Sequence, residues 1–441
     1  MKIKLPRLLL AILLSCTAVQ AGSVADYPEI SSGSIVFSER NKTGDITPWL
    51  KREVAEDGTV TYTGYRHANG TSYPDILNAT VDAKGTDFYV ASGSSAYGSG
   101  SVYFTNTKIS ADDIYFTGNT KLRNYQNTSA DTGTTVTAKN ITMSDSANTQ
   151  VTSGSYGTIK LVAEEKVTVK GTARLNKAEV EANTISLEST SSSAVYQTSL
   201  TADTVQLNGS SVEIGGSKQA VINAKQIDVN SGTLTVAEEA ELSTNIITLN
   251  GGKLVNNGNI GAVVSLAEGA QGNVITITDG ELVNSGSIGA TINMTGGTLV
   301  AEADSYVAGI NATGGDIQVD GGFTMAGDLL LGGDAELIFA DVDSTIDLGD
   351  YDLILDGGSI ALTLTDADIA NVVLFTGAKE DNYSGYEVTL LDAEGNSTGT
   401  AVMKYNANGE VTLGTAAVPE PATATLSLLA LAALAARRRR R

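Results

Sequence analysis

The chain has few of the residues on which most catalytic and metal sites depend. Of 441 residues, one is a cysteine, Cys16, and one is a histidine, His67. Cys16 falls in the leader, so the remaining chain has no thiol and is expected to be stabilised by packing and hydrogen bonding alone. A lone histidine excludes a multi-histidine metal site, and in "GYRHANG" it is expected to be a surface loop residue rather than a catalytic base. No nucleophile elbow, phosphate loop or zinc motif is present.

Proline is also missing from most of the chain. The 6 prolines stand at positions 6, 28, 48, 74, 419 and 421, which leaves none between Asp75 and Val418. Loops of ordinary multi-domain chains usually contain proline, whereas a continuous strand ladder needs every backbone N–H. Aromatic residues are only 5% of the chain and glycine is 47 of 441, which also favours one elongated repetitive body over several compact domains.

Positive charge is scarce outside the two ends. The formal net charge is -22, although Lys2, Lys4 and Arg7 contribute +3 and Arg437 to Arg441 contribute +5, which leaves about -30 on the body. A surface this acidic repels phosphate backbones and anionic lipid. Nucleic acid is therefore excluded as a partner, and calcium, cationic partners and neutral sugars remain open.

What the chain does contain is a repeat. From residue 110 onward a small residue, two polar residues and an alternating apolar pair recur, as in "TAKNITM" from Thr137, "TADTVQL" from Thr201 and, offset by one, "STNIITL" from Ser243. This alternation is typical of half-buried strands. The first apolar residues stand at 167, 185, 205, 227, 247, 275, 292 and 310, with spacings of 18, 20, 22, 20, 28, 17 and 18 residues.

A period near 20 favours the coils of a solenoid over propeller blades, whose period is about 40. Gly-Gly steps, as in "ITLNGGKLV" from Ile247, are expected to supply positive φ values at the coil corners. The sequence therefore predicts an all-β fold, a right-handed parallel β-helix (β-solenoid) with N- and C-terminal caps. An antiparallel β-sandwich is the main alternative.

Composition divides the body into three regions. Residues 22–105 are rich in tyrosine and contain Trp49, and we expect an irregular capping region there, with an aromatic sugar-binding face as the alternative. Residues 106–328 are predicted as solenoid repeats. Residues 329–415 are predicted as a C-terminal β cap that includes two hairpins with glycine turns. In style the body resembles the passenger regions of autotransporters.

Residues 1–21 have the layout of a Sec signal peptide. Basic residues precede an apolar run from Leu8 to Leu14, and the small residues Val19 and Ala21 precede "GS", which predicts cleavage after Ala21. The Sec translocon and signal peptidase are thus expected partners. A lipoprotein site at Cys16 is the alternative, although Leu14 stands where such sites usually have a smaller residue.

Residues 416–441 form a tripartite tail: Pro419-Glu420-Pro421, an uncharged run from Ala422 to Ala436, and Arg437, Arg438, Arg439, Arg440 and Arg441. As a helix the uncharged run would rise only about 22 Å, short of the roughly 30 Å hydrocarbon core. The arginines are expected to stay on the cytoplasmic side. The run is therefore predicted to be a transient transmembrane helix rather than a permanent anchor.

The order and spacing of these three parts resemble a PEP-CTERM sorting signal, the tail processed by exosortase-type membrane proteases in Gram-negative bacteria with exopolysaccharide-rich surfaces. The resemblance implies export, transient retention in the inner membrane, cleavage near Pro419-Glu420-Pro421, and transfer to the outer surface or extracellular matrix. It covers only the tail and implies nothing about the activity of the body.

Two further interpretations concern ligands. An acidic cluster near the C-terminal end could bind calcium, the one cofactor left open; its members are Asp341, Asp343, Asp347, Asp350, Asp352 and Asp356. The spacing does not match an EF-hand loop, because Ile346 stands where that loop needs glycine. Solvated strand faces explain the cluster more simply. With no catalytic, cofactor or metal residue identified, we expect a non-catalytic surface or matrix protein that adheres to exopolysaccharide, other surface glycans or neighbouring cells. A β-helix polysaccharide lyase or glycoside hydrolase is the alternative.

Overall fold

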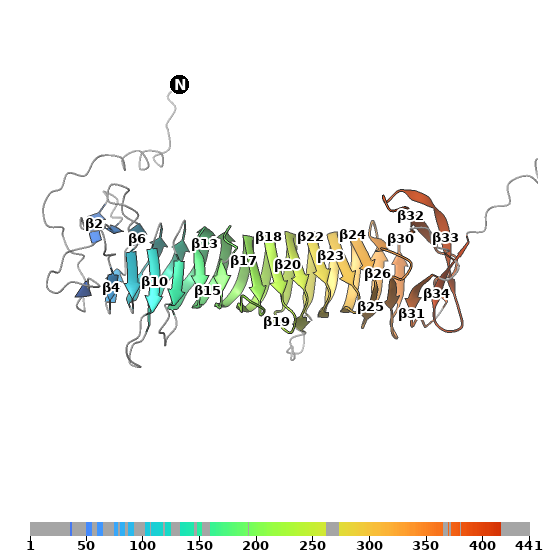
Figure 1. Ribbon diagram of the computed structural model, residues 1–441, viewed down its shortest axis with the longest axis horizontal. Coiled ribbons are helices and arrows are strands. Elements are labelled where there is room, and N and C mark those ends of the chain that lie inside the picture. The colour runs from blue at the N-terminus through green and yellow to red at the C-terminus, as the bar shows by residue number, and fades with distance from the viewer. Residues whose placement is uncertain are drawn as a thin grey trace, which may run out of the picture.

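The computed structural model describes most of the chain from residue 102 to residue 415. Gaps within this part lie at 106, 118–119, 125–132, 145–147, 152–158, 193, 262–272, 365–368, 370–371 and 380. Shorter described stretches lie at 36–37, 50–54, 60–64, 75–77, 80–83 and 87–91. Over these residues the chain forms one elongated stack of strands (Figure 1).

Short strands make up the first part of the stack. They are β1 (Val36–Phe37), β2 (Leu50–Val54), β3 (Val60–Gly64), β4 (Asp75–Leu77), β5 (Thr80–Ala83), β6 (Phe88–Ala91), β7 (Val102–Thr105), β8 (Lys108–Ala111), β9 (Asp113–Phe116) and β10 (Thr120–Asn124). β2 and β3 are antiparallel, but β3 already pairs in parallel with β6, and β4 with β7. Strands of the tyrosine-rich region thus stack on the same ladders as the strands that follow.

The middle of the stack contains long strands that bend at coil corners. Its strands are β11 (Thr135–Met143), β12 (Asn148–Val151), β13 (Ile159–Gly171), β14 (Arg174–Asn176), β15 (Ala178–Ser189), β16 (Val195–Tyr196), β17 (Ser199–Ile214), β18 (Val221–Val236), β19 (Glu241–Ser243), β20 (Ile246–Asn256), β21 (Asn259–Gly261), β22 (Val274–Asn284), β23 (Ser287–Glu302), β24 (Tyr306–Asp320) and β25 (Gly322–Met325). All of their mutual pairings are parallel, from β11 with β13 to β24 with β25.

Each coil contributes three strand segments, which form three faces of the stack. In the coil that begins at β17, the first face contains Ser199–Ala202, the second Thr204–Leu207 and the third Ser211–Ile214. The second face is continuous: the apolar residues at 167, 185, 205, 227, 247, 275, 292 and 310 pair one with the next and form a single buried column. The predicted parallel β-solenoid is therefore confirmed, and the sandwich alternative is wrong.

Glycines at the corners have the positive φ values that the repeat predicts. Gly232, Gly280 and Gly297 have φ values of 88°, 94° and 70°. A Cβ atom added to Gly280 would collide with the carbonyl oxygen of Gly252 in the preceding coil. Glycine is needed there both for the backbone conformation and for the close approach of one coil to the next.

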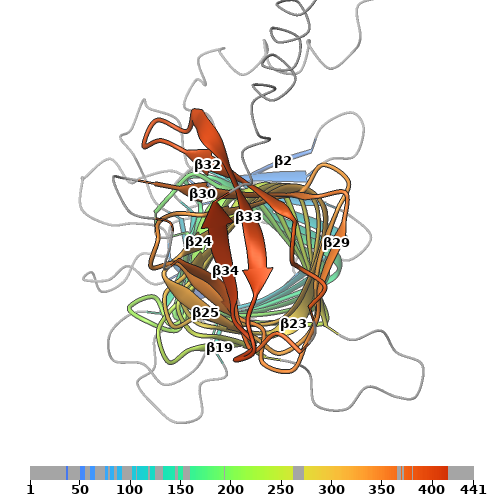
Figure 2. The same ribbon diagram turned by 90° about the vertical axis from the view of Figure 1, so that its right-hand side faces the viewer.

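The last strands close the stack. They are β26 (Leu329–Gly332), β27 (Glu336–Phe339), β28 (Thr345–Asp347), β29 (Leu353–Asp356), β30 (Ser359–Thr363), β31 (Val373–Thr376), β32 (Glu387–Leu391), β33 (Ser397–Tyr405) and β34 (Val411–Thr415). Parallel stacking continues as far as the pairing of β30 with β32, whereas β32, β33 and β34 pair antiparallel with one another, as the two predicted hairpins. Figure 2 shows β33 and β34 lying across the end of the stack.

This antiparallel cap, β32 to β34, covers the interior with apolar side chains. Val388, Met403 and Val411 are fully buried, and Phe339 and Phe375 pack edge to face beneath them with ring centroids 5.5 Å apart. The Tyr386 hydroxyl donates a hydrogen bond to the Gly358 carbonyl at 2.8 Å. The cap thus covers strand edges that would otherwise be open to aggregation. Among the described residues no helix is long and apolar enough to cross a membrane.

Candidate functional site

The predicted sorting and processing residues lie outside the described part of the chain. This applies to Val19 and Ala21, to Pro419, Glu420 and Pro421, and to Arg437, Arg438, Arg439, Arg440 and Arg441. His67, Cys16 and Trp49 lie outside it as well. The site features that the structure does place belong to the outer surface of the solenoid.

A polar column runs along the second face. Thr142, Thr168, Ser186, Gln206, Asp228, Thr248, Thr276, Asn293 and Asn311 pair in register from one coil to the next. All but Ser186 and Asn311 are half-buried, and Asp228 is the one charged member. The Asp228 carboxylate accepts hydrogen bonds from Gln226 at 2.7 Å and from Gln206 at 3.4 Å. The column is therefore a nearly neutral row of hydroxyl and amide groups.

A ladder of asparagines borders this column. The Asn230 amide donates to Asn208 at 2.8 Å, the Asn250 amide donates to Asn230 at 2.9 Å, and Thr278 donates to Asn250 at 3.0 Å. Because the amides of Asn230 and Asn250 both donate and accept, the ladder connects four successive coils through side chains as well as backbone. It fixes the spacing of polar groups on this side of the solenoid.

A furrow runs along the corner between the first and second faces. It has a volume of about 620 Å³ and is lined by the same three positions of successive coils. Its floor contains Ala163, Ala182, Ala202 and Ala224. One rim is formed by Val162, Glu181, Thr201, Asn223 and Ser243, and the other by Glu164, Asn183, Asp203 and Lys225.

The recurring small residue of the sequence motif explains the furrow. In "EANT", "TADT" and "NAKQ" the alanine stands between two polar residues, and pairing places Ala182, Ala202 and Ala224 directly above one another. A methyl group at each coil leaves a hollow that a larger side chain would fill. Sequence reasoning identified the strand but missed this hollow, although an alanine at a fixed place in each repeat was the available signal.

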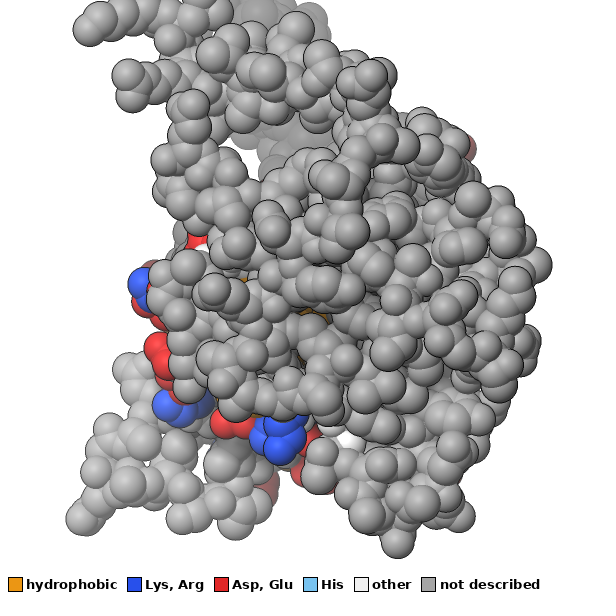
Figure 3. All heavy atoms as spheres, turned by 90° about the vertical axis from the view of Figure 1, so that its left-hand side faces the viewer, with side chains coloured by type: hydrophobic (Ala, Val, Ile, Leu, Met, Phe, Trp, Pro, Cys, Tyr) orange, Lys and Arg blue, Asp and Glu red, His pale blue; other side chains and the backbone are white. Residues whose placement is uncertain are grey.

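Two lysines contact the carboxylates of the furrow. Lys160 Nζ lies 3.4 Å from Glu181 Oε2, and Lys225 Nζ lies 2.7 Å from Asp203 Oδ1. These four side chains are 43% to 74% exposed, so the pairs add little to stability. Figure 3 shows the molecule from the N-terminal end of the stack. Where side chains are coloured by type, basic and acidic ones lie side by side along one flank.

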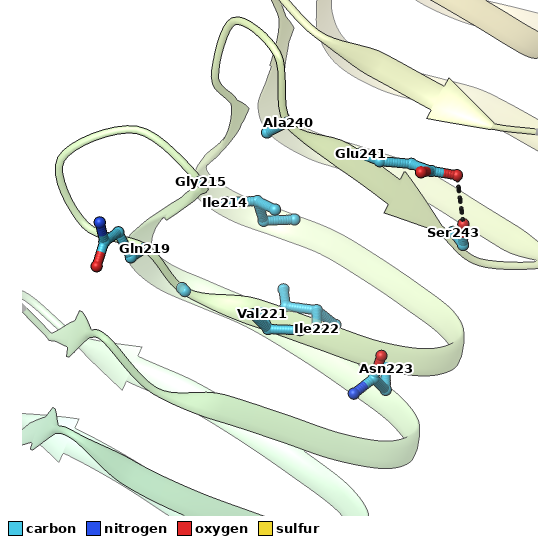
Figure 4. A pocket seen from close by; sticks show the side chains of 10 residues that line it. Ile214, Gly215, Gln219, Val221, Ile222, Asn223, Ala240, Glu241 and Ser243 are labelled. Atoms are coloured by element: carbon cyan, nitrogen blue, oxygen red, sulfur yellow. Dashed lines mark hydrogen bonds between the residues drawn. The ribbon is translucent and has the colours of Figure 1, made fainter.

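One end of the furrow adjoins a break in the first face. On one side of the break Leu200 pairs with Ile222, and on the other side Leu242 pairs with Ile260. Among the described strands, Val221–Ala224 of β18 do not pair with β19. Figure 4 shows the notch between these two segments, which is about 400 Å³ in volume and is bordered by the turn at Gly215 and Gln219. The notch shares Asn223 and Ser243 with the furrow, so the two hollows adjoin.

A buried threonine lies at this break. Thr244 occupies the place that alanine has in the preceding coils, and its hydroxyl donates to the Lys225 carbonyl at 3.3 Å. The Asn245 backbone N–H donates to the same carbonyl at 3.2 Å. The alanine column therefore ends at the coil where the ladder of the first face is interrupted.

The acidic cluster of the last coils is used in turns. Asp341 accepts hydrogen bonds from the Ser344 hydroxyl at 2.8 Å and the Asp343 backbone N–H at 3.0 Å. Asp347 accepts from the backbone N–H of Gly349 at 3.0 Å. Over the part of the chain that the structure covers, no three or more Asp, Glu, His or Cys side chains are grouped so that they could hold a metal ion.

Comparison with known proteins adds one match. Residues 417–441 match the family described as PEP-CTERM protein-sorting motif. Neither the curated proteins nor the solved structures gave a match for this chain. The motif implies export, transient membrane anchoring through the C-terminal region and processing by an exosortase. The chain thus carries a PEP-CTERM sorting motif at its C-terminal end, after a β-solenoid body.

Proposed function

We propose that this protein is a non-catalytic component of the outer cell surface or extracellular matrix, whose solenoid adheres to polysaccharide or to neighbouring cells. The observation that carries the proposal is the polar column of the second face. Hydroxyl and amide groups stand at eight of nine registered positions of successive coils, about 4.8 Å apart, and Asp228 occupies the ninth. A repeating ligand that lies along the solenoid meets a hydroxyl or amide group at most of the coils.

The rigidity of the scaffold supports this role. The interior is filled by stacked aliphatic columns, and the asparagine ladder holds the outer polar groups at constant spacing. Polar groups held in this way lose little conformational freedom when they bind. A repetitive, rigid surface favours many weak contacts that act together, as adhesion requires.

The test uses the processed protein recovered from cells that carry an exosortase. It should co-sediment with at least one neutral surface polysaccharide, and it should release no sugar from any member of the panel. A triple variant, Thr248→Val, Thr276→Val and Asn293→Leu, should lower the bound fraction because it removes three neighbouring members of the column. Sugar release that acidic substitutions on one coil abolish would overturn the proposal in favour of a polysaccharide-degrading enzyme.

Location is tested separately. Cells with an exosortase should yield a protein whose C-terminal mass is reduced by the sorting tail and which is recovered at the outer surface. Cells without the enzyme should retain the tail and keep the protein in the inner-membrane fraction. Recovery of processed protein only in the periplasm would contradict the proposed outer-surface location.

A further inference from the structure

The geometry points to the furrow as a binding site for a linear polysaccharide that bears free amino groups. The inference rests on the proposed function in one respect, since both take the ligand to be a polysaccharide. It concerns a different surface: the furrow at the corner of the first and second faces, instead of the polar column of the second face.

The shape of the furrow suits an extended polymer. Its lining repeats over Val162–Glu164, Glu181–Asn183, Thr201–Asp203 and Asn223–Lys225, and it continues to Ser243. Four neighbouring coils span roughly 15 Å along the solenoid axis. The alanine floor lets a flat ring approach the backbone, because only methyl groups stand in its way. A linear chain of a few sugar units would lie lengthwise in this hollow.

The rims supply the polar contacts. Asn183, Thr201, Asn223 and Ser243 place one amide or hydroxyl group at each coil, and all four are exposed. Such groups donate and accept hydrogen bonds with sugar hydroxyls. The strand segments beneath are paired on both sides at Glu181 and Thr201, so the furrow offers no free backbone ladder for a peptide strand to join there.

The charge of the furrow selects the type of polysaccharide. Its lining contains three carboxylates, Glu164, Glu181 and Asp203, and one ammonium group, that of Lys225. The adjoining notch adds Glu241. An anionic polymer would be repelled, both here and by the acidic body as a whole, whereas amino groups would be attracted.

The two lysines show where ammonium groups sit. Lys160 and Lys225 place their Nζ atoms 3.4 Å and 2.7 Å from Glu181 and Asp203, on successive coils. The side chains of Lys160 and Lys225 are 43% and 74% exposed, so a ligand ammonium can replace them at low cost. Among the described ion pairs, none involves Glu164, which leaves that carboxylate open to a ligand.

Binding is tested with the processed protein and two sets of oligosaccharides of equal length: de-N-acetylated β-linked glucosamine oligomers and their fully N-acetylated counterparts. Titration calorimetry should detect the amino form, with affinity that falls as salt rises, and it should detect the acetylated form at least about tenfold more weakly. Equal affinity for both forms would contradict the inference, as would tighter binding of oligolysine of the same length, which would assign the furrow to a peptide.

Two variants separate the furrow from general charge attraction. Glu164→Gln, Glu181→Gln and Asp203→Asn together should weaken binding of the amino oligomer about tenfold or more. The matched control, Glu213→Gln, Asp316→Asn and Glu336→Gln, removes the same charge from the third face and should change affinity less than about twofold. Equal losses in the two triple variants would overturn the inference.

A third variant tests the shape without a change in charge. Ala202→Leu fills the floor and should weaken binding as strongly as the charge variant, measured well below the variant's melting temperature and with a circular dichroism spectrum that remains that of the wild type. Unchanged affinity would contradict a ligand seated on the alanine floor. If the processed protein sediments with a neutral polysaccharide and the furrow variants leave that binding unaltered, the furrow inference fails while the proposed function stands.

Discussion

The parallel coils and the antiparallel cap solve the same packing problem in different ways. In the coils, Leu282 lies between Leu254 of the preceding coil and Leu299 of the next, so one residue type has to fit two neighbours. In the cap, Leu413 pairs with Met403, an unrelated residue on a neighbouring antiparallel strand. Repetition of sequence is therefore a requirement of the coils and not of the cap. The antiparallel strands from Glu387 onward accordingly contain no copy of the repeat.

The largest effect is expected from a matched pair of leucine substitutions. Leu282→Ala leaves a cavity between two coils that cannot close, because backbone ladders fix their spacing, and it should lower the free energy of unfolding by about 4 kcal/mol. Leu413→Ala should cost about 2 kcal/mol, since Leu413 lies at the less constrained end. Denaturant unfolding combined with hydrogen exchange on both variants would measure this. A larger loss for Leu413→Ala would contradict the contrast.

Glycine offers a second matched pair. Gly280 and Gly395 both have positive φ, 94° and 82°, but a Cβ at Gly280 would strike the preceding coil, whereas one at Gly395 would meet nothing within 4 Å. Gly280→Ala should therefore destabilise by about 3 kcal/mol and Gly395→Ala by about 1 kcal/mol. Melting temperatures of the two variants give the comparison, and equal shifts would show that coil stacking adds nothing to backbone strain.

A smaller effect is expected on the outer surface of the coils. Asn230→Ala removes the hydrogen bonds to Asn208 and Asn250, at 2.8 Å and 2.9 Å. Since water can replace them, the loss in free energy of unfolding should be about 1 kcal/mol. Hydrogen exchange of the Asn208 and Asn250 backbone amides should rise locally, with no change in the cap. A global loss of protection would mean that the ladder is required for the coils to form.

Much of the fold could be predicted from the sequence because each coil of the solenoid repeats the same pattern of buried apolar and exposed polar residues. The apolar residues marked from Val167 to Ile310 turned out to be one stacked column, and the absence of proline agreed with continuous ladders. The Gly-Gly corners and the two hairpins after Glu387 were also confirmed. Alternation and turn chemistry are local signals, so they can be read without knowledge of the partner strand.

The break in the first face was not predictable by the same reasoning. The motif "STNIITL" differs from "NAKQIDV" in a way that looks like ordinary variation, with Thr244 in place of Ala224. Only the structure shows that the Thr244 hydroxyl and the Asn245 N–H both use the Lys225 carbonyl. The furrow likewise depends on which residues stack across coils, since Glu181 and Thr201 are 20 positions apart in sequence but pair in register.

The smallest expected effect is a pH dependence confined to the cap. Asp392, in the turn of the first hairpin, accepts hydrogen bonds from the Asn396 backbone N–H at 2.7 Å and from the Asn396 side-chain amide at 3.1 Å and 3.2 Å. These bonds, that of the Asn396 backbone first, lower the pKa of the Asp392 carboxyl below its ordinary value, and the Glu394 backbone N–H contributes as well.

Because the folded state lowers this pKa, the carboxylate stabilises the turn fully above the ordinary aspartate pKa of about 4, and that contribution is lost as the pH falls through the lower folded value. The Asp392 carboxyl resonance should titrate below pH 4, and exchange of the Asn396 amide should accelerate over the same range. Asp392→Asn should remove this pH dependence while leaving hydrogen exchange around Leu282 unchanged. Titration of Asp392 at or above pH 4 would show that these hydrogen bonds do not hold the turn, and the cap would then depend on its apolar contacts alone.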